Sequence, residues 1–101
     1  MENTLYDIVN MAKETLKDAL SNGQDLQEAI LEIADQSVPV YNSDLLELAV
    51  ENPFLGTETP EIYAFNGEHT AINAIAGNLY AHIEEKLYEY AEELETETEL
   101  N

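Results

Sequence analysis

Hydrophobic residues recur at intervals of three and four through most of the chain, which is the spacing of one face of an α-helix. The first stripe predicts a helix with the inner face Leu5, Ile8, Val9, Ala12, Leu16, Ala19 and Leu20. Thr4 and Asp7 have the spacing of a capping pair at its start, and Asn22-Gly23 forms a stop signal after it. We therefore expect an amphipathic first helix with one buried face.

Two further helices are expected before the middle of the chain. The second has the inner face Leu26, Ala29, Ile30, Ile33 and Ala34. Asp25 is expected to cap it, with Glu28 at the N3 position, and Pro39 ends it because the residue before a proline avoids helical backbone. A short third helix is expected from Asp44 to about Val50, with Ser43 as its cap.

The pattern changes at residues 53–69, where prolines and glycines predict an irregular segment with a short extended piece at Glu61–Phe65. Helical spacing then returns and predicts a helix from about Thr70 to Glu95, roughly 39 Å long. Its inner face is Ile72, Ile75, Ala76, Leu79, Ile83, Leu87, Tyr90 and Leu94. The expected fold is all-α: three to four helices with a long C-terminal helix and an irregular 53–69 segment. Residues 1–101 are expected to form a single acidic helical domain.

The charge of the chain is strongly one-sided. Its 101 residues include 22 acids against 3 lysines and no arginine, which gives a formal charge of −19. The 45% hydrophobic content is that of a folded protein, so the acids belong to a folded body. Three lysines cannot form a basic patch, and this excludes direct binding to nucleic acid or to an anionic membrane surface.

The chain has no cysteine, which excludes disulfides, thiolate catalysis and zinc–thiolate sites. No apolar run approaches the ~20 residues of a membrane span, and the start of the chain lacks the basic residues of a signal peptide. We therefore expect a cytoplasmic protein.

Motifs for catalysis are missing. Neither His69 nor His82 is part of a Glu-x-x-His pair, and His82-Ile-Glu84 matches a zinc deaminase signature whose cysteines this chain lacks. The acids do not form a calcium-binding loop, and no glycine-rich phosphate loop is present. We expect no enzymatic activity, no cofactor and no metal site.

The acids follow helical spacing. On the second helix, one row lies opposite the apolar stripe and consists of Asp25, Glu28, Glu32 and Asp35. On the last helix, a second row consists of Glu85, Glu89, Glu92 and Glu93, with Glu84, Tyr88 and Glu95 beside it. Like charges one turn apart each cost a few tenths of a kcal/mol, and solubility needs a net charge of only ~2–8, so the excess indicates another role.

Imitation of DNA is one such role. Duplex DNA has one charge per ~1.7 Å of axis, and consecutive phosphates on one strand lie roughly 6–7 Å apart. Carboxylates repeated at every helical turn approximate that spacing. A helical body with such rows would compete with DNA for the basic groove of a DNA-binding enzyme.

Residues 25–50 resemble the central motif of the Ocr family of phage antirestriction proteins. The matching positions are Asp25-Leu26, Ala29-Ile30, Ala34-Asp35, Val38-Pro39, Tyr41 and Asp44. The resemblance is weaker in the first helix and in residues 75–95, and residues 53–70 do not match. This chain also departs from the family in its lower charge, its shorter acidic tail and its different middle loop.

The resemblance implies an all-helical homodimer that is shaped and charged like bent B-form DNA. It also implies blockade of the DNA groove of type I restriction–modification enzymes in the infected bacterial cell, or of related phage-exclusion systems. Asp25, Asp35 and Asp44 fall within the matched segment, and Glu28 and Glu32 lie inside it at positions of suitable type.

The resemblance also favours a dimer contact made by the third helix and the following segment, with the candidate residues Leu46, Val50 and Phe54. Apolar residues of the 53–69 segment can instead cover the core of a single copy. Two other functions stay open. One is inhibition of another nucleic-acid enzyme, such as a CRISPR effector or a uracil-DNA glycosylase. The other is an acidic adaptor that binds a basic partner protein without imitating DNA.

Overall fold

The computed structural model describes residues 4–56 and 60–100, and the side chains of residues 4–56 and 72–95. In chain order its elements are α1 (Leu5–Ser21), α2 (Leu26–Ser37), α3 (Asn42–Glu51), the 3₁₀-helix η1 (Pro53–Leu55) and α4 (Pro60–Leu100). The described part of the chain has no strand. The expected all-α fold with a long C-terminal helix is thus confirmed.

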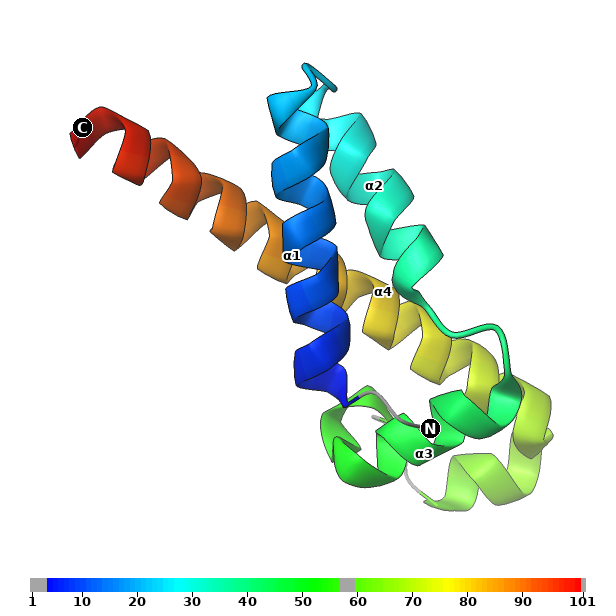
Figure 1. Cartoon of the computed structure of the whole chain (residues 1–101). Helices are drawn as coiled ribbons and strands as arrows, with labels where there is room; N and C mark the ends of the chain where they lie inside the picture. The colour runs from blue at the N-terminus through cyan, green and yellow to red at the C-terminus, as the bar shows by residue number, and fades with distance from the viewer. Residues whose placement is uncertain (1–3, 57–59, 101) are drawn as a thin grey trace.

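The helices form an elongated body around α4 (Figure 1). α1 and α2 run antiparallel to each other, and both pack against α4. α3 and η1 pack against another part of α4. The body measures 53 × 24 × 21 Å, so it is more than twice as long as it is wide.

Local capping signals fix the ends of α1 and α2 as expected. The Thr4 hydroxyl oxygen accepts a hydrogen bond from the Asp7 backbone N–H, and the Asp7 carboxylate accepts one from the Thr4 backbone N–H. Gly23 has a φ of 86°, a left-handed conformation that glycine adopts without strain, and it reverses the chain after α1. The Asp25 carboxylate accepts from the Glu28 backbone N–H at 3.2 Å and caps α2.

The start of α3 differs from the expectation. The helix begins at Asn42, with Tyr41 at the N-cap position, so the prediction of Ser43 as its cap is wrong. The Tyr41 side chain makes no capping bond, and its backbone carbonyl accepts instead from the N–H groups of Asp44 and Leu45. Extended backbone at Val38, just before Pro39, ends α2.

The expected irregular segment is also shorter than predicted. Residues 53–55 form η1, and residues 57–59 lie outside the described residues. Helical backbone begins at Pro60, so the prediction of an extended piece at Glu61–Phe65 is wrong. A proline at the first position of a helix is well tolerated, because the N–H that it lacks would have no partner inside the helix.

A continuous apolar core joins the helices. The fully buried side chains of α4 are Ile75, Leu79, Ile83 and Leu87, and those of the other elements are Leu16, Ala29, Ile30, Ala34, Leu48 and Leu55. The Asn78 side-chain amide donates to the Leu55 backbone carbonyl at 2.7 Å and holds η1 on α4. Among the residues with described side chains, none that is polar or charged is buried, so every acid in that set reaches the surface.

No helix in the described ranges is both long enough and apolar enough to span a lipid bilayer.

Candidate functional site

The acidic row of α2 lies on the outer face of that helix. Asp25, Glu28, Glu32 and Asp35 are all exposed, and the buried side chains of α2 occupy the opposite face. Steps of three and four residues move along a helix by 4.5–6 Å, close to the separation of phosphates on a DNA strand. The structure therefore brings the four predicted residues of α2 into one line of carboxylates.

Two members of this row also make contacts within the protein. Asp25 is the cap of α2. The Glu32 carboxylate accepts hydrogen bonds from the side-chain amides of Gln24 and Gln36, each at 3.3 Å. Both donors are uncharged, so they orient the carboxylate and leave its negative charge in place.

The acidic row of α4 is less uniform. Glu85, Glu89, Glu92 and Glu93 are exposed as expected, and Glu84 beside them is half-buried. The Lys86 ammonium lies 3.4 Å from the Glu89 carboxylate and offsets part of its charge. Such an exposed ion pair contributes little stability. The α4 row therefore presents four exposed glutamates, and Glu89 among them has a neighbouring cation.

The pKa of Tyr80 on α4 is raised by acids of two helices. Partial burial raises the pKa of Tyr80 above the ordinary 10.0, and the negative charges of Glu84 and Asp35 raise this pKa further. Asp35 belongs to α2 and Glu84 to α4, so the two carboxylates act on the same hydroxyl. The phenol stays neutral at physiological pH, and the region around it is negative.

Acids outside the two predicted rows also line the surface. On α1 these are the exposed Asp7, Glu14 and Asp18, and on α3 they are the half-buried Asp44 and the exposed Glu47 and Glu51. Of these six, only Asp44 was expected at the site, through the family resemblance. The other five acids have the same sequence signal as the two predicted rows. They lie three, four or seven residues from the next acid, opposite a buried stripe. Acids therefore lie on the outward faces of all four helices.

The lysines do little to balance these acids. The Lys13 ammonium of α1 lies 5.6 Å from the centre of the Tyr90 ring of α4, which is a cation–π distance. Lys86 is engaged with Glu89. A net charge of −19 over a length of 53 Å gives about one negative charge per 3 Å, against one per ~1.7 Å for duplex DNA. One copy thus reaches somewhat more than half of the charge density of a duplex.

His82 takes part in a packing contact. Its ring centre lies 5.1 Å from that of Phe54 of η1, with a tilt of 54° between the planes. Partial burial lowers the pKa of His82 and nearby Lys86 lowers it further, whereas Glu85 and Glu89 act in the opposite direction. The side chain of His69 lies outside the described residues. Within the described part, no three His, Asp or Glu side chains gather closely enough to hold a metal ion.

The candidate dimer residues lie together near the junction of α3 and η1. Val50 is 80% exposed, Phe54 is 51% exposed and Leu46 is half-buried. Leu46 and Val50 line an apolar groove of about 360 Å³, whose other walls are Ala49, Pro53, Gly56 and Ile75. These residues form an exposed apolar patch.

Comparison of the chain with protein-family models, with curated proteins and with solved structures finds no match.

The packing of His82 predicts a pH dependence of stability. Because burial lowers its pKa in the folded protein, the unfolded chain binds this proton more readily. The stabilising contribution is present above the unfolded pKa of about 6.5 and decreases as the pH falls from there toward the folded pKa. His82→Phe keeps a ring against Phe54 but cannot titrate.

Urea unfolding at a series of pH values from 7.5 down to 5 measures this effect. The difference in unfolding free energy between H82F and the wild-type protein should shift in favour of H82F as the pH falls. A difference that is independent of pH would show that the environment of His82 does not disfavour its charge.

Proposed function

We propose that this protein is a non-catalytic DNA mimic that occupies the DNA-binding groove of a bacterial defence enzyme. The observation that supports this most is the presence of acids on the outward faces of all four helices of an elongated body. The protein would act inside the infected bacterial cell, where such enzymes meet foreign DNA.

The distribution of charge favours imitation over simple solubility. Glu28 and Glu32 of α2 lie four residues apart, as do Glu85 and Glu89 of α4, and like charges at this spacing destabilise a helix. An acidic surface that repels itself is costly in a domain of this size. A basic groove lined by lysine and arginine would relieve this repulsion on binding, as it does for phosphates.

The rigidity of the rows supports the same function. Each row lies on a helix whose opposite face is buried in one core, so the helical positions from which the acids project are fixed relative to one another before binding. Preorganised charges bind more tightly than flexible ones, because less conformational entropy is lost. A flexible acidic tail would attract a basic groove without matching its shape.

The proposed target is based on the family resemblance of residues 25–50. The segment that resembles the Ocr family covers α2, the connection at 38–41 and nearly all of α3. Its acids Asp25 and Asp35 are exposed, and Asp44 is half-buried in the first turn of α3. On this resemblance we propose type I restriction–modification enzymes as the target, together with related phage-exclusion systems.

A second candidate function follows from apolar side chains that DNA does not have. Val40 is 89% exposed, and Tyr41 beside it is also exposed, in the connection between α2 and α3. Such residues would suit an acidic adaptor that binds a basic protein through mixed polar and apolar contacts. Inhibition of a different nucleic-acid enzyme, such as a CRISPR effector or a uracil-DNA glycosylase, rests on the same acidic rows as the main proposal.

Neutralising the α2 row tests whether position or only total charge matters. In the combined variant Glu28→Gln, Glu32→Gln and Asp35→Asn, the side-chain sizes stay the same and three negative charges are lost. The concentration that half-inhibits a type I enzyme in a DNA cleavage assay should rise about tenfold, as expected when rim charges of an interface are removed. The melting temperature should stay level or rise, because repulsion along α2 is relieved.

The matched control removes three charges near the chain ends, through Glu2→Gln, Glu97→Gln and Glu99→Gln. It should change the half-inhibiting concentration by less than about twofold. Equal losses in the two variants would mean that inhibition depends on diffuse charge, and the proposal of shaped imitation would then be wrong.

We also propose a two-fold homodimer formed through α3 and η1. Its contact would use Leu46, Val50 and Phe54, where the surface is apolar. Two copies that each have a charge of −19 repel, so a contact is most favourable where apolar area is exposed.

Val50→Glu should break this dimer, because it places an unpaired charge in the contact. Such a charge costs several kcal/mol and should raise the dissociation constant at least about 100-fold. Val40→Glu adds the same charge at another exposed valine and should leave the dimer intact. Sedimentation velocity at micromolar concentration measures both variants, and a wild-type protein that sediments as a monomer would contradict the proposal.

A further inference from the structure

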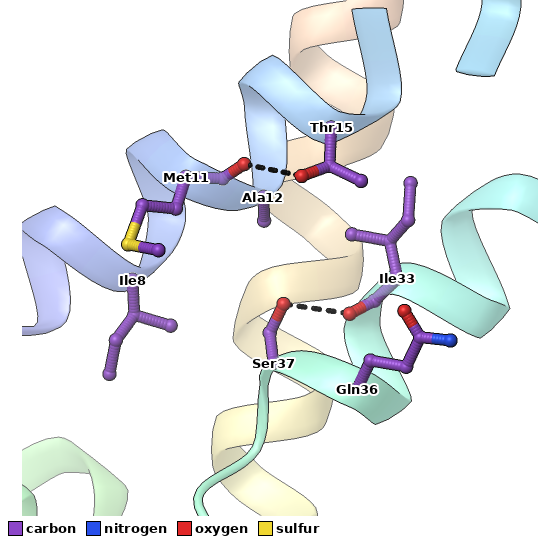
Figure 2. Close-up of a pocket in the computed structure, with 7 residues that line it drawn as sticks. All are labelled: Ile8, Met11, Ala12, Thr15, Ile33, Gln36 and Ser37. Atoms are coloured by element: carbon purple, nitrogen blue, oxygen red, sulfur yellow. Dashed lines mark hydrogen bonds between the residues drawn. The ribbon is translucent and has the colours of Figure 1, made fainter. Parts of the chain in front are cut away.

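A groove of about 290 Å³ lies between α1 and α2. Its lining shares no residue with the apolar groove that Leu46 and Val50 line. Figure 2 shows the side chains of the two helices that line it. Its apolar lining includes the buried Ile8 and Ala12 of α1 and the buried Ile33 of α2. Met11, which is 58% exposed, also lines it and is a flexible side chain that adapts to different occupants. The volume is at the lower end for ligand sites and suits one long side chain.

The two hydroxyl groups of this groove are arranged as hydrogen-bond acceptors. The Thr15 hydroxyl donates to the Met11 carbonyl at 2.9 Å, and the Ser37 hydroxyl donates to the Ile33 carbonyl at 2.7 Å (Figure 2). Each hydroxyl has a single hydrogen, so its oxygen has only lone pairs left for an occupant. Gln36 also lines the groove, and one hydrogen of its side-chain amide is donated to Glu32. An occupant therefore has to supply the donors at the two hydroxyl oxygens.

Carboxylates flank the groove on both helices. On α2, the Glu32 carboxylate accepts a hydrogen bond from Gln36, which itself lines the groove. On α1, the exposed Glu14 and Asp18 each lie three residues beyond a lining residue, at the distance of helical neighbours. None of the residues that line the groove is basic. The surroundings of the groove are therefore negative.

We propose that this groove binds an arginine side chain of the target protein. The alkyl stem would lie on the apolar lining, and the guanidinium group would donate to Thr15, Ser37 and the Glu32 carboxylate. A guanidinium has five donors and no acceptor, which complements the two hydroxyl oxygens and the nearby Glu32 carboxylate. A lysine has three donors on a compact, more strongly hydrated charge, and it fits this arrangement less well.

This inference rests on the proposed function for the source of the arginine, since a DNA-binding groove presents basic side chains to any occupant. It adds an apolar contact that a row of phosphates does not have. Charge alone attracts every basic groove, whereas a groove that holds an arginine by its stem prefers targets with an arginine at the matching position. The α1–α2 groove would thus determine which enzyme is inhibited.

Methyl NMR of the methionines tests the groove directly. The chain has two methionines, Met1 and Met11, so the ¹³C-methyl spectrum has one signal at the groove and one reference signal. Tri-arginine and tri-lysine are titrated separately at equal ionic strength. The Met11 signal should shift saturably, with a midpoint at least about fivefold lower for tri-arginine. Equal midpoints, or equal shifts at Met1 and Met11, would overturn the proposal.

Two variants separate the groove from general attraction. Thr15→Val with Ser37→Ala removes both acceptor oxygens without any change of charge, and it should raise the tri-arginine midpoint about threefold or more. Ser21→Ala is the matched control, because the Ser21 hydroxyl makes the same kind of bond to the Lys17 carbonyl, at 2.9 Å, outside the groove. An unchanged midpoint in the double variant would overturn the proposal.

Glu32→Gln provides a second variant that leaves both hydroxyls in place, with Asp44→Asn as a control of equal charge. The midpoint should rise in E32Q and stay level in D44N, and equal changes would contradict the groove. The titration contains neither enzyme nor DNA. Failure of arginine binding would therefore refute the groove while inhibition of the enzyme still stood. Arginine binding without inhibition would support the groove and contradict the proposed function.

Discussion

Repulsion among 22 carboxylates is the constraint on which the rest of this structure depends. A chain with this charge stays compact only if burial of apolar surface outweighs that repulsion. The buried face of α4 makes this possible, because α1, α2, α3 and η1 all pack against that helix. Every described acid then lies at the surface, and the same packing that stabilises the fold sets the positions of the acidic rows.

Polar contacts also hold separate elements against α4. Asn78 holds η1 on α4 through the Leu55 carbonyl, and Lys13 joins α1 to α4 through the Tyr90 ring. Neither contact uses a carboxylate. The described acids stay at the surface, where a partner can reach them. Apolar contacts thus hold the helices together, and the acids are left at the surface, as the proposed imitation of DNA requires.

Features that depend on neighbouring residues were predictable from the sequence. The caps at Thr4 and Asp25 and the turn at Gly23 are local, because the bonding partners lie within three residues or the backbone of one residue decides the outcome. The α2 and α4 rows were predictable for the same reason, since helical spacing alone puts them opposite the buried stripes. The rows on α1 and α3 have the same signal, but of their acids only Asp44 was expected at the site.

Some helix boundaries, and the features that depend on distant contacts, were not predictable. Ser43 has the side chain of a cap, but α3 begins one residue before it, with the Tyr41 carbonyl accepting the first backbone bonds. The pattern at residues 60–69 also suggested a loop, because its glycine and asparagine weigh against a helix in sequence but are tolerated inside α4. The effect of Asp35 on the pKa of Tyr80, and the groove between α1 and α2, arise only when separate helices pack together.

Displacement of duplex DNA from a purified type I restriction–modification enzyme tests the central claim most directly. A fluorescent duplex bound to the enzyme is titrated with this protein at a series of salt concentrations from about 50 to 200 mM. Imitation of DNA predicts complete, competitive displacement, with an affinity for the enzyme that falls at least about tenfold over this range. A ternary complex of enzyme, duplex and this protein, or an affinity that does not change with salt, would contradict it.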